Sequence, residues 1–197
     1  MTVSLGMDFS TLLNSVRACS ACEGLPLGPK PIFQIDPRAP ILIAGQAPGR
    51  LTHEKGVPFD DPSGNRLRQW LGVTREAFYD PEKFSIFPMG LCFPGSAKGG
   101  DLPPRQECAP LWRKRVLAQL PNIQLTIALG KYAQDWYLGD ERGANLTETV
   151  RNWRAHWPQL LPLPHPSPRN ISWFKRNAWF EAEMIPLLQS RVTELLH

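Results

Sequence analysis

The sequence predicts a three-layer α/β/α sandwich around a central, mostly parallel, four-stranded sheet. Four short apolar runs have the continuous hydrophobicity of strands that are buried on both faces: 41–44, 84–87, 125–129 and 160–163. Segments with the pattern of helices lie between and after them: 65–71, 108–119, 132–138 and 178–196, the last with an expected kink or break at Pro186. Strands that alternate with helices indicate a parallel sheet covered on both faces.

Three of the four strands are followed by loops rich in glycine or proline. The loop 45–49 follows the first strand, 88–92 follows the second, and 164–170 follows the fourth. In sheets of this kind ligands bind beyond the carboxyl ends of the strands. We therefore expect these loops to converge on one cleft.

Length and composition predict one globular domain over residues 1–197. A chain of 197 residues can bury one sizeable core, and its 42% hydrophobic content argues against disorder. No stretch approaches the roughly 20 apolar residues of a membrane span, and the first twenty residues lack the apolar region of a signal peptide. We expect a monomeric, cytoplasmic protein without membrane contact. The net charge of +4 slightly favours an anionic partner such as nucleic acid.

The four cysteines form two pairs, Cys19-x2-Cys22 and Cys92 with Cys108. A C-x-x-C turn can place two sulfurs on one metal centre. The second pair is too widely spaced for a zinc ribbon, whereas iron–sulfur ligation tolerates irregular intervals, so a [4Fe–4S] cluster is favoured over zinc. A third interpretation is that the cysteines form disulfides, which would require an oxidising compartment.

Several residues in the predicted loops are of types that could contact a ligand. Gly45, Pro48 and Gly49 allow a sharp turn and a close approach to a flat ligand. Phe59 could offer a stacking face, or it could be a loop aromatic that caps the core. His165 lies between two prolines that restrict its backbone. Its imidazole could be functional, or it could have a structural role.

Taken together, these motifs resemble the uracil-DNA glycosylase superfamily, and within it the iron–sulfur family 4. The family's opening motif, G-E-A/G-P-G followed by G-x-P-F and a later A-G, reads 45–49 (GQAPG), 56–59 (GVPF) and 63–64 (SG) here. The closing motif His-Pro-Ser/Ala is found at 165–167, and the family's four cluster ligands fall on Cys19, Cys22, Cys92 and Cys108. The matches occur in the family's order across most of the chain.

The resemblance implies that the protein flips a nucleotide out of DNA and breaks its N-glycosidic bond. His165 would hydrogen-bond the base carbonyl as negative charge develops there, and amides around Gln46 and Ala47 would act in the same sense. Phe59 would stack on the base. The substrate-binding residues are expected to be Gly45, Ala47, Pro48, Gly49, Phe59, Asp60 and Asn170, with His165 and Gln46 as the catalytic pair.

Two positions depart from the family pattern. Gln46 stands where the family has Glu, and an amide cannot act as a carboxylate base. Pro88 stands at the place of the family's base-reading Asn and offers neither a side-chain amide nor a backbone N–H. Asp60, Asp61, His53 and Glu54 are candidates to replace the lost groups, and each could equally be a solvated loop charge. Asn170 is a further candidate for reading the base.

A DNA-binding surface is expected in the last quarter of the chain. Residues 151–180 contain five Arg or Lys side chains, no acid and several interleaved aromatics. Such cations can meet phosphates while aromatics or a loop tip enter the base stack. The expected DNA contacts are Ser167, Pro168, Arg169, Lys175 and Arg176, with Pro168 and Arg169 as the wedge that the family inserts into the duplex.

Three functional hypotheses follow. The first is a DNA repair glycosylase that excises a deaminated base, with uracil as the expected substrate and a [4Fe–4S] cluster beside the DNA-binding surface. The second is a superfamily member that binds DNA or a lesion with little or no cleavage, which the changes at Gln46 and Pro88 keep open. The third is a redox or nucleic-acid module with a cluster or zinc, whose glycosylase-like loops are coincidental.

Overall fold

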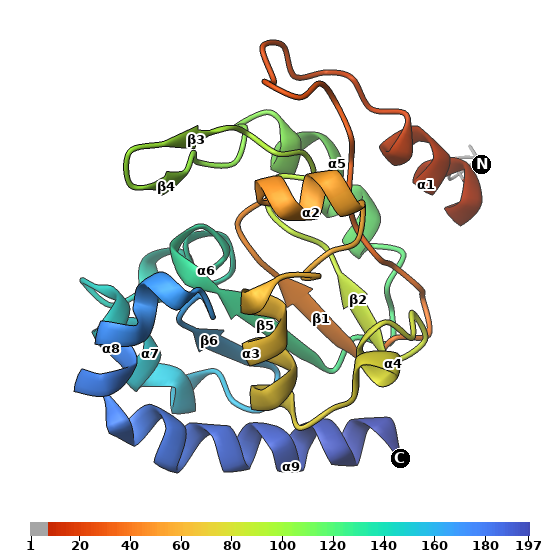
Figure 1. Ribbon diagram of the computed structural model, residues 1–197. Coiled ribbons are helices and arrows are strands. Elements are labelled where there is room, and N and C mark those ends of the chain that lie inside the picture. The colour runs from red at the N-terminus through yellow and green to blue at the C-terminus, as the bar shows by residue number, and fades with distance from the viewer. Residues whose placement is uncertain (1–7) are drawn as a thin grey trace.

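The centre of the molecule is a four-stranded parallel sheet in the order β2-β1-β5-β6 (Figure 1). The structure is a computed structural model and describes residues 8–197. The strands are β1 (Ile41–Ala44), β2 (Phe84–Ile86), β5 (Leu125–Leu129) and β6 (Leu160–Leu163). Every pairing in this sheet is parallel, with Ile41 opposite both Phe84 and Leu125. The predicted fold class is confirmed, and the sheet is parallel throughout.

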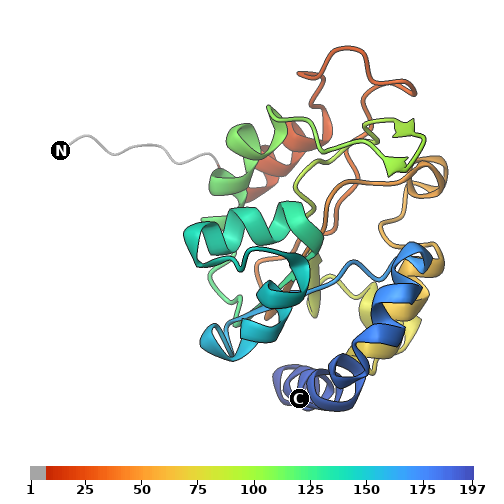
Figure 2. The same ribbon diagram turned by 90° about the vertical axis from the view of Figure 1, so that its left-hand side faces the viewer.

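Helices cover both faces of the sheet (Figure 2). In β1, Ile41 and Ile43 point into one buried cluster and Leu42 into another, because successive side chains of a strand face opposite sides. The first cluster is closed by α3 (Pro62–Leu71), α4 (Arg75–Phe78), α8 (Ile171–Arg176) and α9 (Ile185–Leu196). The second face is covered by α1 (Phe9–Arg17), α5 (Cys108–Leu117) and α6 (Gly130–Leu138). The sheet is therefore the middle layer of three.

The longer elements lie where the sequence predicts them, with small shifts at their ends. The second strand ends at Ile86, one residue earlier than expected, and α3 begins at Pro62 instead of residue 65. The segment 178–196 is divided: a π-helix, η4 (Phe180–Met184), precedes α9, and Pro186 lies in the first turn of α9. A proline is tolerated there because the first turn of a helix leaves its N–H groups without intrahelical partners.

Several short elements are found where the sequence analysis predicts none. They are α1, α2 (Arg50–Lys55), α4, α7 (Leu146–Arg151), α8, the strands β3 (Ser96–Ala97) and β4 (Gly100–Asp101), and the 3-10 helices η1 (Gly139–Glu141), η2 (Asn152–Ala155) and η3 (Pro168–Asn170). Most span less than two helical turns, which is too short for hydrophobic periodicity to be informative. Local caps begin some of them, as where Asp8 accepts hydrogen bonds from the amides of Ser10 and Thr11.

The aromatic residues of 151–180 belong largely to the core. Trp153, Trp173, Phe174 and Phe180 are buried in the cluster beneath α3 and α9. The rings of Trp173, Phe174 and Phe180 pack against one another and near Trp70; Trp70 meets Phe180 edge-on with 5.0 Å between centroids, while Phe174 and Phe180 are stacked. The expectation that these rings stack on bases is wrong, because the core already covers their faces.

Within residues 8–197, no helix combines the length and apolar character needed to cross a lipid bilayer.

Candidate functional site

An open cleft lies at the carboxyl ends of β1, β2 and β6, and it holds about 1430 Å³ of space, part of it open to solvent. It brings together eleven of the predicted substrate- and DNA-contacting residues: Gly45, Gln46, Ala47, Pro48, Gly49, Phe59, His165, Ser167, Pro168, Arg169 and Asn170. Pro88 and the hairpin residues 99–101 also line it. The loops after three different strands converge as the parallel topology requires.

The loop 45–49 is fixed by the segment that follows β2. The amide of Met89 donates to the carbonyl of Gly45 and the amide of Gly90 to that of Gln46, both at 2.8 Å. The side-chain Nε2 of Gln46 donates to the carbonyl of Leu102 at 2.8 Å. Gln46 thus ties the cleft floor to the β3–β4 hairpin.

Phe59 reaches the cleft through an unusual backbone conformation. Its φ of 55° is the one positive φ among the non-glycine residues described, and such a conformation is unfavourable for a bulky side chain. Its carbonyl accepts a hydrogen bond from Nη1 of the buried Arg68 at 3.3 Å. A Cβ at Gly64 would lie 1.7 Å from the same carbonyl oxygen. Arg68 and the absence of a side chain at Gly64 therefore hold Phe59 in place.

The Phe59 ring forms part of the cleft wall. It packs edge-on against Phe78, with ring centroids 6.3 Å apart, and lies nearly parallel to the imidazole of His165 at 6.4 Å. Its tip approaches Gly45, where a Cβ would stand 3.4 Å away. The ring is therefore held between two loops and remains partly exposed, as a stacking surface requires.

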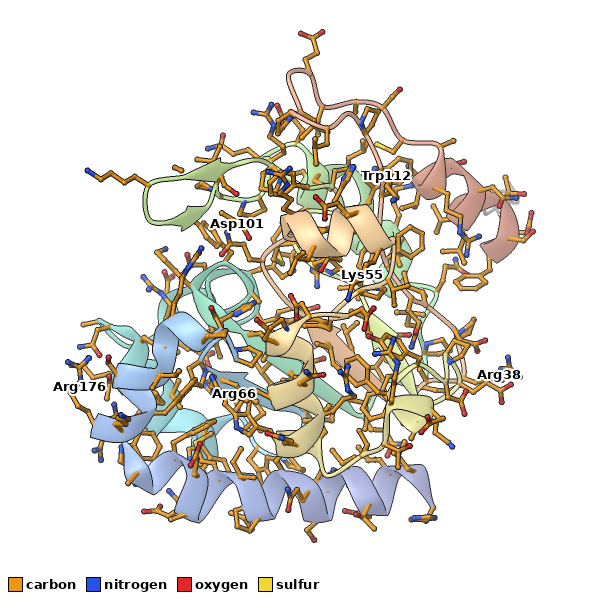
Figure 3. The ribbon with its side chains drawn as sticks, in the orientation of Figure 1. Arg38, Lys55, Arg66, Asp101, Trp112 and Arg176 are labelled. Atoms are coloured by element: carbon orange, nitrogen blue, oxygen red, sulfur yellow. The ribbon has the colours of Figure 1, made fainter. Side chains whose placement is uncertain are left out.

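His165 is positioned by its own loop and by α3. The side-chain amide of Asn170 donates to the carbonyl of His165 at 2.8 Å, so Asn170 supports the loop. Nη1 of Arg66, a residue of α3, donates to the carbonyls of Pro166 and Ser167 at 3.3 and 3.4 Å (Figure 3). The sequence analysis did not identify Arg66 or Arg68, because nothing local marks an arginine that bonds a distant carbonyl.

The surroundings of His165 disfavour the charged form of its imidazole. Burial lowers the pKa of His165 and outweighs the opposing influence of Asp61 and Asp101, while the positive charge of Arg169 adds weakly to the effect of burial. A neutral imidazole has one N–H donor and one acceptor nitrogen. At neutral pH it can donate to a carbonyl without adding charge to the cleft.

Three residues expected in the site lie outside the cleft lining. Asp60 forms ion pairs with Lys55 and Arg75, which lower the pKa of its carboxyl group. Lys175 and Arg176 are exposed in the last turn of α8, and Arg176 lies at the outer edge of the molecule (Figure 3). Any DNA that they contact would have to extend well beyond the cleft.

Two of the suggested replacement groups also lie elsewhere. Glu54 pairs with Arg50 on the surface of α2. His53 is buried, its ring lies 6.2 Å from that of Phe93, and burial together with nearby Lys30 lowers its pKa.

The cleft instead contains the carboxylates of Asp61 and Asp101. Asp61 caps α3, with its Oδ1 accepting from the amide of Gly64 at 2.8 Å. Asp101 lies on the β3–β4 hairpin, which the sequence analysis did not predict. Lys98 and Gly99 form the two-residue turn between the paired Ala97 and Gly100, and the glycines at this point could have indicated a hairpin.

The four cysteines line one pocket of about 430 Å³, next to but separate from the cleft. Cys19 and Cys22 come from the chain after α1, Cys92 from the loop after β2, and Cys108 from the start of α5. Residues almost ninety positions apart in the sequence thus surround the same space. Among the residues described, no three Cys, His, Asp or Glu side chains are grouped as ligands of a single metal ion.

N–H groups point at the sulfurs from the surrounding framework. Trp112 Nε1 donates to Cys19 Sγ at 3.2 Å, and the amide of Leu91 donates to Cys108 Sγ at 3.4 Å. Burial raises the pKa of Cys108 to about 12, and nearby Cys22, Cys92 and Cys19 contribute to that increase. Four crowded thiolates are unfavourable by themselves, so this donor set fits a positively charged metal centre.

A buried arginine joins the cysteine pocket to the cleft. Arg113 of α5 is 1% exposed, and it donates to the carbonyl of Phe87 at 2.9 Å and to that of Pro88 at 3.0 Å. Its Nη2 also contacts the hydroxyl of Tyr137 at 3.0 Å. Since α5 begins at Cys108, one helix carries a pocket cysteine and supports the cleft loop that contains Pro88.

Comparisons with known proteins show which chains this one is similar to. The family model described as the uracil DNA glycosylase superfamily matches residues 32–189, which is most of the chain. A solution NMR structure of a candidate uracil DNA glycosylase from Methanosarcina acetivorans is 15% identical. It aligns over 84% of this chain and 98% of that one, with a TM-score of 0.48.

Proposed function

The chain belongs to the uracil DNA glycosylase superfamily, and we propose that it hydrolyses the N-glycosidic bond of a deaminated base, uracil foremost, flipped out of DNA. The observation that carries the proposal is the meeting of the loop 45–49, Phe59 and His165 in one cleft. The loop 45–49 and Phe59 follow β1 whereas His165 follows β6, so their convergence is a property of the fold as a whole. The cleft is open enough to admit a nucleotide that has left the base stack.

In this proposal the flipped base stacks on the Phe59 ring. Arg68 and Gly64 fix the backbone of Phe59, so little conformational freedom is lost when the base binds. Stacking on an aromatic side chain contributes about 1–3 kcal/mol per base and depends little on the identity of the base. Phe59 would hold the base without selecting it.

His165 would stabilise the departing base. As the bond from the sugar to the base breaks, its electron pair moves onto the base, and a base carbonyl gains negative charge. A hydrogen bond from neutral His165 becomes stronger at that stage, which is differential stabilisation of the transition state. The lowered pKa of His165 supports this role, because a permanent cation would also bind DNA phosphates and the ground state.

DNA contact is assigned to the rim of the cleft at residues 167–169. The guanidinium of Arg169 lies against the hairpin, where a Cβ at Gly100 would stand 2.2 Å from its Nη1. Arg169 can neutralise a phosphate beside the flipped nucleotide, while Pro168 occupies the gap in the base stack.

We further propose that Cys19, Cys22, Cys92 and Cys108 hold a [4Fe–4S] cluster. All four cysteines line one pocket, and iron–sulfur ligation accepts the irregular spacing of the second pair better than a zinc ribbon does. Once bound, the cluster would cross-link the segment after α1 to α5. Its role in this proposal is structural.

The proposal is tested with oligonucleotides that each contain a single uracil, hypoxanthine, xanthine or T·G site. Alkali-sensitive strand breaks are measured for the wild type and for His165→Ala, together with the Kd for the same DNA. We expect excision of uracil by the wild type and a loss of at least about 10²-fold in His165→Ala with Kd changed less than about threefold. Absence of breaks at every lesion would refute the enzymatic function.

A second candidate function is recognition of DNA damage without efficient cleavage. Two observations favour it: the Gln46 amide is engaged with the hairpin, and Pro88 contributes no side-chain donor to the cleft. The same experiment separates the two, since this function requires lesion-selective binding and no strand breaks.

A further inference from the structure

We infer that Asp101, on the β3–β4 hairpin, is the carboxylate that binds and deprotonates the water that attacks the sugar. This inference rests on the proposed glycosylase function and assigns the group that Gln46 cannot supply. It concerns a residue outside the motif-bearing loops, on a hairpin formed by Ser96–Ala97 and Gly100–Asp101.

The carboxylate of Asp101 lies in the cleft and is anchored on one side only. Its Oδ1 accepts a hydrogen bond from the Ser96 hydroxyl at 2.8 Å. Its Oδ2 faces the loop 45–49, so closely that a Cβ at Gly49 would lie 3.1 Å from it. Figure 3 labels Asp101 beside the β3–β4 hairpin. Asp101 and His165 both line the cleft. One oxygen is thus fixed while the other faces the cleft.

Gln46 explains how the hairpin keeps this position. Its Nε2 donates to the carbonyl of Leu102 at 2.8 Å and approaches that of Asp101 at 3.4 Å. The amide of Leu102 in turn donates to the carbonyl of Gly95 at 2.8 Å, which closes the base of the hairpin. The amide at position 46 therefore places a carboxylate from another segment in the cleft.

Asp60 and Asp61 are the other carboxylates that the sequence places near the cleft. Asp60 is paired with Lys55 and Arg75 outside the cleft. Asp61 lines the cleft, but its Oδ1 caps α3 through the amide of Gly64. Within the part of the chain that the structure describes, Asp61 and Asp101 are the only acidic residues in the cleft lining. Asp61 is thus the one alternative that an experiment must exclude.

The reaction balances with water as the co-reactant. The water oxygen bonds to C1′ of the sugar while the bond from C1′ to the base nitrogen breaks and its electron pair leaves with the base. The water proton passes to the Asp101 carboxylate and then, through solvent, to the released base. The products are an abasic site with a hydroxyl on C1′ and the neutral free base.

The test compares single-turnover excision of uracil and the Kd for the same DNA in Asp101→Asn, Ser96→Ala, Lys98→Ala and Asp61→Asn. Asp101→Asn keeps the oxygen that Ser96 binds and removes only the charge, so we expect excision to fall about 10²-fold or more with Kd within about threefold. Ser96→Ala keeps the carboxylate but removes the hydrogen bond that anchors it, so excision should fall less than in Asp101→Asn. Lys98→Ala, at an exposed position of the same hairpin outside the cleft lining, is the control for hairpin stability, and its excision should stay within about threefold of wild type.

Each outcome has a defined meaning. A wild type that cleaves no lesion refutes the function and the inference together. If the wild type cleaves and Asp101→Asn keeps its rate, only the inference is wrong. A larger loss in Asp61→Asn than in Asp101→Asn would move the role to Asp61 and likewise overturn it.

Gln46→Glu gives an independent check. A carboxylate at this position would face the carbonyl oxygens of Leu102 and Asp101 and could not donate to them. The inference therefore expects slower excision in Gln46→Glu, because the hairpin is released. Faster excision would show that the carboxylate that deprotonates the water belongs at position 46, and would contradict the inference.

Discussion

Gly64→Ala should destabilise the protein and disturb the cleft, although Ala normally favours a helix. Gly64 lies in the first turn of α3, where the chain carrying Phe59 crosses it. A methyl group there would stand 1.7 Å from the carbonyl oxygen of Phe59 and 2.6 Å from its carbonyl carbon. Since the neighbouring atoms are backbone, rotating a side chain cannot relieve this overlap.

The magnitude follows from three effects. Forcing a methyl group into a packed position costs about 1–3 kcal/mol. Displacing Phe59 also weakens the bond from Arg68 Nη1 to its carbonyl, now 3.3 Å long, and a hydrogen bond from a charged donor contributes about 1.5–3 kcal/mol. The higher helix propensity of Ala offsets about 1 kcal/mol of this loss of stability. The net expectation is a loss of about 3 kcal/mol, or a fall in Tm of about 6–12 °C for a chain of this size.

Urea denaturation and thermal melting of Gly64→Ala measure this loss. Gly99→Ala serves as the matched control for stability, because no heavy atom lies within 4 Å of a Cβ at Gly99. The free energy of unfolding of that control should change by less than about 0.5 kcal/mol. Unchanged or increased stability in Gly64→Ala would refute the argument that Phe59 is locked against α3. Excision should fall as well, since the stacking ring moves with its backbone.

Three further predictions concern the rest of the molecule. Cys108→Ser should lower the iron and sulfide content of the purified protein and its broad visible absorption; unchanged metal content would contradict the ligand assignment. Arg113→Met should lower the free energy of unfolding, measured by urea denaturation, by about 3–5 kcal/mol, because two buried carbonyls lose their donor. Lys114→Met, on the exposed side of the same helix, is the control and should lower it by less than about 0.5 kcal/mol. Burial lowers the pKa values of His53 and His165, so the unfolded chain binds more protons than the folded one between the folded pKa values and the ordinary value of 6.5. The free energy of unfolding should therefore fall as the pH drops through that window and stay constant above it. The double replacement His53→Gln with His165→Gln should flatten this dependence, as measured by thermal melting at a series of pH values.

The continuous apolar runs determined the sheet, and the cysteine spacing determined that a shared thiol site was possible. A strand buried on both faces must be apolar at every position, so 41–44, 125–129 and 160–163 could be located from the sequence with their bounds correct. The loops after the strands had to meet, because parallel strands end at one edge of a sheet. The sequence therefore indicated the cleft and eleven of its residues.

Which side chains face the cleft was decided only by the tertiary structure. Asp60 and Asp61 are adjacent in sequence, yet one pairs with Lys55 and Arg75 while the other lines the cleft. The aromatics of 151–180 looked like a nucleic-acid surface but pack in the core, since composition does not say which face of a segment is buried. Asp101 is placed by hydrogen bonds with Gln46 and Ser96, and contact with Gln46 spans 55 positions, so no local pattern could indicate it. Local pattern determines the elements because they form from neighbouring residues, whereas the site depends on contacts between segments that only the folded chain brings together.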